Sequence, residues 1–283
     1  MSNAKTLRPN VVAAPRTATV FETAVESYSP RRNGDARTRT FPHFLALPMH
    51  YEPKYAYPLI VWLHDAGSSE TEIFDVAPQI SQRNYVAIAP RGLACPRVQV
   101  ACRRSSDGRL IVENRREEIR CDWPETEQGV YEAENLVLYS IDQALAKANV
   151  NRRRVFLAGR GSGGTMALRV ALRNPREFAG VVSIDGAFPT LERRPLRDWR
   201  DARDLPILMT TGSGSATPRL TPKQLRLFHT AGLTVVVRQY NERSNEPNAA
   251  ETRMKKILLD VDRWAMNRAL NPSSPISELF PTR

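Results

Sequence analysis

The sequence lacks the features that would place a protein in a membrane or on a secretory route. None of its apolar runs approaches the length of a membrane span, and Met1–Lys5 lack the apolar core of a secretory signal. No tandem repeat of any period stands out. We therefore expect a cytoplasmic protein without a membrane span. Its 283 residues, 41% of them hydrophobic, suffice for one domain with a full core.

Cysteine is scarce, and its spacing matches no common structural site. The three cysteines, Cys95, Cys102 and Cys121, are odd in number and form no Cys-x-x-Cys pair. This spacing argues against a disulfide framework and against a zinc site. We expect reduced structural thiols, no bound metal and no cofactor.

Lysine is also scarce, although the chain is strongly basic. Only six of the 41 basic residues are lysines, and with 30 acidic residues the net charge is +11. Such an excess favours an anionic partner, for example nucleic acid, an acidic protein or a phosphorylated substrate. The arginines are scattered, however, and no nucleic-acid-binding motif accompanies them, which is typical of a solvated surface.

Buried strands alternate with helices along the chain. Continuous apolar runs indicate buried strands, and apolar residues recurring at three and four indicate amphipathic helices. The expected strands are 41–48, 57–64, 85–90, 155–158, 178–186, 205–212 and 233–240. The expected helices are 70–83, 127–148, 165–174, 221–229 and 248–270. The pattern predicts an α/β fold with a mostly parallel central sheet and helices on both faces.

One domain over residues 41–270 accounts for this pattern. Residues 1–40 are polar with little periodicity and are expected to form an extended or poorly ordered arm, and 271–283 form a tail. Within the domain, 93–126 interrupt the pattern as an irregular basic excursion. A small hairpin of 98–100 with 109–112 is expected inside that excursion.

The domain is organised around the turn that follows the strand at 155–158. Glycines stand at 159, 161 and 163, and a helical stretch follows. In a nucleophile elbow the corresponding pattern is Gly-x-Ser-x-Gly, because the strained turn leaves room only for small residues beside the nucleophile. Here Gly161 stands where the nucleophilic serine would be.

The motifs resemble the α/β hydrolases of the phospholipase/carboxylesterase family, which includes acyl-protein thioesterases. The resemblance covers about residues 41–268 and rests on four landmarks: Leu63–Gly67, Ala89–Gly92, Trp123 and the turn motif at 158–168. It implies hydrolysis of esters or thioesters by a serine, a histidine and an acid, with backbone N–H groups holding the oxyanion.

All three catalytic positions implied by the resemblance hold other residues. The nucleophile position is Gly161, the acid position after the strand ending near Thr211 is Ser215, and the histidine position is Asn245. No acidic residue occurs between Asp204 and Glu242, and no histidine follows His229. We therefore expect a pseudo-hydrolase that binds a small acyl or anionic ligand.

Two alternatives stay open. Ser162, one residue past the elbow tip, would act as nucleophile in a weak or unconventional ester hydrolase, with His64 or a water relay as base. The simpler interpretation is that its hydroxyl caps the following helix. The second alternative is a basic interaction protein whose arm and 93–126 excursion bind nucleic acid or an acidic partner.

A residual binding site is expected at the carboxyl ends of the central strands, where ligands bind in open α/β sheets. Backbone N–H groups of Ser162 and of the loop after His64 would form an anion-binding nest there. The candidate ligand-binding residues are His64, Asp65, Gly67, Ser162 and Asp185.

Overall fold

The computed structural model describes most of residues 41–271, together with one short segment before them. The described residues are 20–23, 41–93, 97–100, 116–189, 201–212, 221, 226, 228, 230–240 and 248–271, and for 20–23, 97–100 and 116–119 only the main chain is described. Ser215, Asn245 and most of the expected helix 221–229 lie outside these residues, as do most of the arm and the tail.

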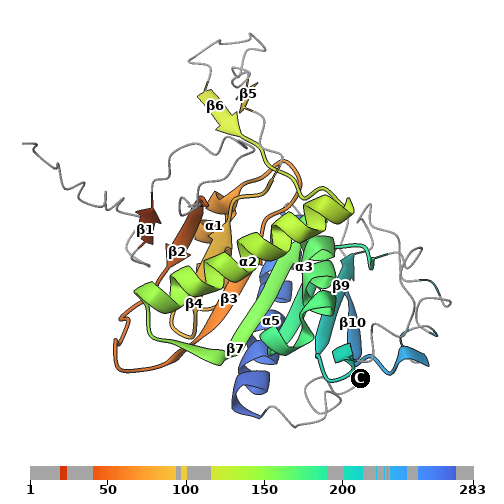
Figure 1. Ribbon diagram of the computed structural model, residues 1–283. Coiled ribbons are helices and arrows are strands. Elements are labelled where there is room, and N and C mark those ends of the chain that lie inside the picture. The colour runs from red at the N-terminus through yellow and green to blue at the C-terminus, as the bar shows by residue number, and fades with distance from the viewer. Residues whose placement is uncertain are drawn as a thin grey trace, which may run out of the picture.

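Eight strands form one twisted sheet in the order β1-β2-β4-β3-β7-β8-β9-β10 (Figure 1). They are β1 Val20–Thr23, β2 His43–Ala46, β3 Tyr57–Leu63, β4 Val86–Pro90, β7 Val150–Arg160, β8 Gly180–Ile184, β9 Ile207–Gly212 and β10 Val235–Tyr240. The pairs β1–β2 and β2–β4 are antiparallel, whereas every other neighbouring pair is parallel. The predicted α/β class is confirmed, and β1 extends the sheet into the segment expected to be an arm.

Helices cover both faces of this sheet (Figure 1). They are η1 Glu70–Glu72, α1 Ile73–Ile80, α2 Glu127–Lys147, α3 Ser162–Arg173, η2 Pro175–Glu177 and α5 Ala249–Leu270. α2 and α3 pack into one apolar cluster with the sheet, and α1 and α5 pack into a second cluster on the opposite face. The domain therefore has two core layers separated by the sheet.

The burial of the central strand β3 on both faces explains its uninterrupted apolar sequence. All seven of its residues are buried. Leu59, Val61 and Leu63 belong to the cluster under α2 and α3, whereas Ile60 and Trp62 belong to the cluster under α1 and α5. Successive side chains of a strand point to opposite faces, so a strand covered on both sides needs apolar residues at every position.

The basic excursion contains a two-stranded antiparallel sheet. Its strands are β5 Arg97–Val100 and β6 Arg116–Ile119, which pair antiparallel, and residues 109–112 lie outside the described residues. The first expected strand is confirmed as β5, and its partner β6 was not predicted. β6 has the sequence Arg-Glu-Glu-Ile, and its charged residues carry no apolar alternation by which a strand is recognised.

The expectation of reduced thiols is wrong for Cys121, which is disulfide-bonded. Cys95 and Cys102 lie outside the described residues. The main chain of Cys121 forms an isolated antiparallel bridge with Ser68, and its side chain is buried. The sequence rule failed because it judged the number and spacing of cysteines, whereas a disulfide needs only two sulfurs that the fold brings together.

Within the described residues, no helix has both the length and the apolar content that crossing a membrane requires.

Candidate functional site

The turn between β7 and α3 consists of the single residue Gly161. β7 ends at Arg160 and α3 begins at Ser162. Gly161 has φ 52° and ψ −120°, a conformation that residues with a side chain rarely adopt. Its amide N–H donates to the Ile184 carbonyl of β8 at 2.8 Å, so the turn is fixed to the neighbouring strand. This geometry is that of a nucleophile elbow with no side chain at its tip.

The glycines on either side of Gly161 are required by packing. A Cβ on Gly159 would lie 2.5 Å from the Gly163 carbonyl oxygen, because the turn brings the two residues against each other. A Cβ on Gly163 would lie 2.7 Å from the carbonyl carbon of Leu63 at the end of β3. Real Cβ atoms do not approach other atoms so closely, so α3 can start against β3 only with glycine here.

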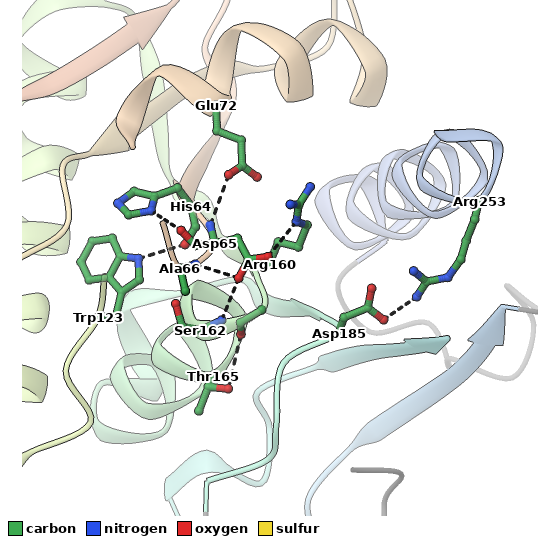
Figure 2. Close-up of polar contacts among 11 residues, drawn as sticks. His64, Asp65, Ala66, Glu72, Trp123, Arg160, Ser162, Thr165, Asp185 and Arg253 are labelled. Carbon is green, nitrogen blue, oxygen red and sulfur yellow. Dashed lines mark hydrogen bonds and ion pairs between the residues drawn. The ribbon is translucent and has the colours of Figure 1, made fainter. Parts of the chain in front are cut away.

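The carboxylate of Asp65 occupies the space beside Gly161 and points toward Ala66, Arg160 and Ser162 (Figure 2). A Cβ built on Gly161 would lie 2.5 Å from the Asp65 Cγ and would overlap Oδ1. Oδ1 accepts hydrogen bonds from the amide N–H groups of Ala66, at 2.8 Å, and Ser162, at 3.3 Å. Oδ2 accepts from Nε of Arg160 at 3.3 Å. We call Asp65 and these three donors the carboxylate site.

The two backbone donors of the carboxylate site are those that an oxyanion hole uses. In nucleophile-elbow enzymes one N–H comes from the residue after the nucleophile and the other from the loop after the central strand. Ser162 and Ala66 hold these places, and the N-terminal end of α3 adds the positive end of its dipole. Both N–H groups already donate to the Asp65 side chain.

His64 is buried behind this loop. Its side chain is 0% exposed, Nδ1 lies 2.8 Å from the Asp65 carbonyl oxygen, and Nε2 accepts from the Gly92 amide at 3.0 Å. Since Nε2 accepts, the proton of the neutral ring is on Nδ1, which donates to the carbonyl. Burial lowers the pKa of His64 and keeps the imidazole neutral. Both nitrogens are thus used in holding backbone, and the Trp123 indole N–H donates to the His64 carbonyl at 3.0 Å.

Ser162 contributes its backbone to the carboxylate site. It is the first residue of α3, and the cap residue is Gly161, so the expected side-chain cap is not formed. Its Oγ is buried and has no hydrogen-bond partner within the described part of the chain. A serine nucleophile needs a base that accepts its proton, and none of the described residues hydrogen-bonds to this hydroxyl.

Asp185 follows β8 on the same edge of the sheet and is paired with a cation. It has φ 54° and forms an ion pair with Arg253 of α5, whose side chain is 8% exposed (Figure 2). A Cβ on Gly212, the last residue of β9, would lie 2.5 Å from Cζ of Arg253. The guanidinium therefore lies over the end of β9, after which the family's acid would be expected.

Main-chain contacts hold the loop that carries Asp65. The Gly67 amide donates to the Cys121 carbonyl at 2.9 Å, and the Cys121 amide donates to the Ser68 carbonyl at 2.7 Å. The Asp65 amide donates to Oε2 of Glu72 at 3.2 Å. The loop backbone is therefore fixed on two sides, while the Asp65 side chain remains 31% exposed.

The structure brings together only some of the candidate ligand-binding residues. Asp65 and Ser162 meet in the carboxylate site, Gly67 belongs to the same loop at the surface, His64 is buried away from it, and Asp185 pairs elsewhere. Ala66, Arg160 and Arg253 were not among the candidates. The sequence offered a reason to name Arg160, because it stands between two glycines of the turn motif, but it offered none for Arg253. No group of three or more potential metal ligands is found among the described residues.

Comparisons with known proteins give a match to one family model and a likeness in fold to solved structures. The model of the phospholipase/carboxylesterase family matches residues 52–254. The putative esterase NocK of Nocardia uniformis subsp. tsuyamanensis is 35% identical over 72 residues, which make up 25% of this chain and only 20% of NocK. The crystal structure of Arabidopsis thaliana SOBER1 aligns with a TM-score of 0.53 and 22% identity over 76% of this chain and 100% of its own. The structure of an S-formylglutathione hydrolase from Agrobacterium tumefaciens aligns with a TM-score of 0.54 and 14% identity, over 92% of this chain and 99% of its own. At these identities the two structures show the fold alone.

Proposed function

The chain belongs to the phospholipase/carboxylesterase family, and on that premise we propose that it is a member without serine hydrolase activity that retains a binding role. The proposal rests chiefly on one observation. The Asp65 carboxylate lies where a nucleophile side chain would begin and takes both oxyanion-hole N–H groups.

Ester hydrolysis by a serine enzyme needs a nucleophile, a base and an oxyanion hole within reach of the same substrate carbonyl. The elbow tip offers no side chain, because the residue there is Gly161. The backbone donors hold an anion already, so an ester carbonyl would have to displace Asp65 before the donors could polarise it. In addition, His64 uses both ring nitrogens in backbone hydrogen bonds. Each of these features weakens a separate requirement of the reaction.

Ester turnover tests the proposal directly. Purified protein is assayed with p-nitrophenyl acetate and p-nitrophenyl butyrate, alongside the Ser162→Ala variant and a heat-denatured sample. We expect equal rates for the wild type and Ser162→Ala, neither of them above the rate of the heat-denatured sample, because any background comes from exposed side chains and solvent. A fluorophosphonate probe followed by mapping of labelled residues is expected to leave Ser162 unmodified. Turnover that disappears in Ser162→Ala would overturn the proposal and favour an unconventional hydrolase.

A further inference from the structure

We propose that the carboxylate site is a receptor for a small carboxylate ligand, and that Asp65 is an internal occupant which this ligand displaces. The inference rests on the proposed binding role and names its ligand class. A small carboxylic acid, of the kind that ester hydrolysis releases, takes the position of the Asp65 side chain against Gly161.

The three donors match a planar carboxylate. Two N–H groups, of Ala66 and Ser162, converge on one oxygen at 2.8 and 3.3 Å, and Arg160 donates to the other oxygen at 3.3 Å. Hydrogen bonds from a cation or from amides at a helix N-terminus to a carboxylate are stronger than neutral ones. The same set would bind a free carboxylate with no rearrangement of donors.

The ligand has both room and access once Asp65 leaves. Gly161 has no Cβ, so the space at the elbow tip is limited by the Asp65 carboxylate itself. The side chains of Asp65 and Arg160 are 31% and 38% exposed, so a carboxylate can enter from solvent. Because the loop backbone is held by Cys121 and Glu72, rotation of the Asp65 side chain is enough to empty the site.

The surroundings favour a single negative charge over a phosphate dianion. Glu72 lies next to the site, where its Oε2 accepts the Asp65 amide at 3.2 Å. A tetrahedral dianion would bring additional oxygens without described donors and more charge toward this carboxylate. A planar monoanion satisfies the three donors and leaves none of its oxygens unpaired.

Acetate binding to full-length Asp65→Ala tests the proposal. The 15N-labelled protein is titrated with sodium acetate at constant ionic strength, with chloride as the replaced anion, and amide shifts are followed by NMR. We expect saturable shifts centred on Ala66 and Ser162. We also expect a Kd at least about tenfold lower than in the wild type, because the internal carboxylate leaves only a small fraction of the wild-type sites open.

Two further variants and a second anion make the result specific. Asp65→Asn keeps a planar side chain in the site but loses its charge and is therefore a weaker occupant, so we expect it to bind acetate with an affinity between those of the wild type and Asp65→Ala. Arg160→Gln in the Asp65→Ala background is expected to weaken binding at least about threefold, because one charged donor is lost. Inorganic phosphate is expected to bind Asp65→Ala more weakly than acetate does.

Either of two outcomes overturns the proposal: a folded Asp65→Ala protein without saturable shifts at Ala66 and Ser162, or equal acetate affinity in wild type and variant. If Asp65→Ala does not fold, Asp65→Ser takes its place with the same expected results. Ester turnover is measured on separate samples, so the proposed lack of activity can fail while acetate binding stands, and the reverse.

Discussion

Replacing Gly161 with alanine tests whether Asp65 and the elbow tip share one space. The added Cβ would lie 2.5 Å from Asp65 Cγ, so the carboxylate must leave its three donors. A side chain at φ 52° and ψ −120° adds backbone strain of about 1–3 kcal/mol. Loss of the charge-assisted hydrogen bonds adds about 1–2 kcal/mol, a value reduced because Asp65 is 31% exposed. The expected decrease in the free energy of unfolding is about 2–5 kcal/mol.

A double-mutant cycle separates the two contributions. Asp65→Ala removes the group that the new Cβ would strike, so only the strain remains when Gly161→Ala is added. We therefore expect the double variant to be about 1–2 kcal/mol more stable than the sum of the single effects predicts. Urea denaturation followed by circular dichroism gives the four free energies, provided that the slope m stays unchanged among the variants.

Gly67→Ala is the matched control for this cycle. Gly67 also has a positive φ, of 75°, but a Cβ there would meet no atom within 4 Å. Gly67→Ala therefore introduces backbone strain without a steric clash. It is expected to lower the free energy of unfolding by about 1 kcal/mol and to show no coupling to Asp65→Ala. Additivity within about 0.5 kcal/mol in the Gly161 and Asp65 cycle would refute the shared-space reasoning.

Three further predictions concern the surroundings of the site. Arg253→Met removes the largely buried ion pair with Asp185 and is expected to lower the free energy of unfolding by about 2–4 kcal/mol in urea denaturation, more than Asp185→Asn, which keeps a hydrogen-bond acceptor for the guanidinium; equal losses would contradict this. Burial lowers the pKa of both His43 and His64, so as the pH falls below 6.5 these histidines bind protons in the unfolded chain before they do so in the folded one. Their contribution to the free energy of unfolding is therefore fully present above pH 6.5 and decreases below it. Urea midpoints at pH 7.5, 6.5 and 5.5 check this, and a constant midpoint would count against it. Since Cys121 is disulfide-bonded and the chain has three cysteines, thiol titration in denaturant is expected to find one thiol per chain without reductant and three after reduction.

The elements of the fold were predictable because each strand and helix carries its own pattern. α2 was expected at 127–148 and runs from Glu127 to Lys147, with Thr126 accepting the Gly129 amide as its cap. α5 and the buried strands β3, β4, β8 and β9 follow equally local signals. β6 was missed, because its charged residues have no periodicity and only pairing with β5 makes them a strand.

The site was less predictable, since it depends on contacts between distant residues. The glycine spacing located the turn, but the Asp65 carboxylate and the Ser162 amide are 97 residues apart in sequence, and Asp185 and Arg253 are 68 apart. No local pattern indicates that an aspartate from one loop fills the space left by a glycine in another. His64 was named as a candidate because it lies at the carboxyl end of a central strand, although its ring hydrogen-bonds to backbone.

The close packing of Gly159 and Gly163 has a consequence for recognising related chains. Both glycines are needed for α3 to start against β3, whatever residue stands at the tip between them. A search pattern that insists on the reactive serine would discard this chain, whereas one built on the two flanking glycines would retain it. For protein engineering, the same turn is a preformed backbone scaffold. A reactive side chain can be introduced at its tip once Asp65 has been replaced by a smaller residue.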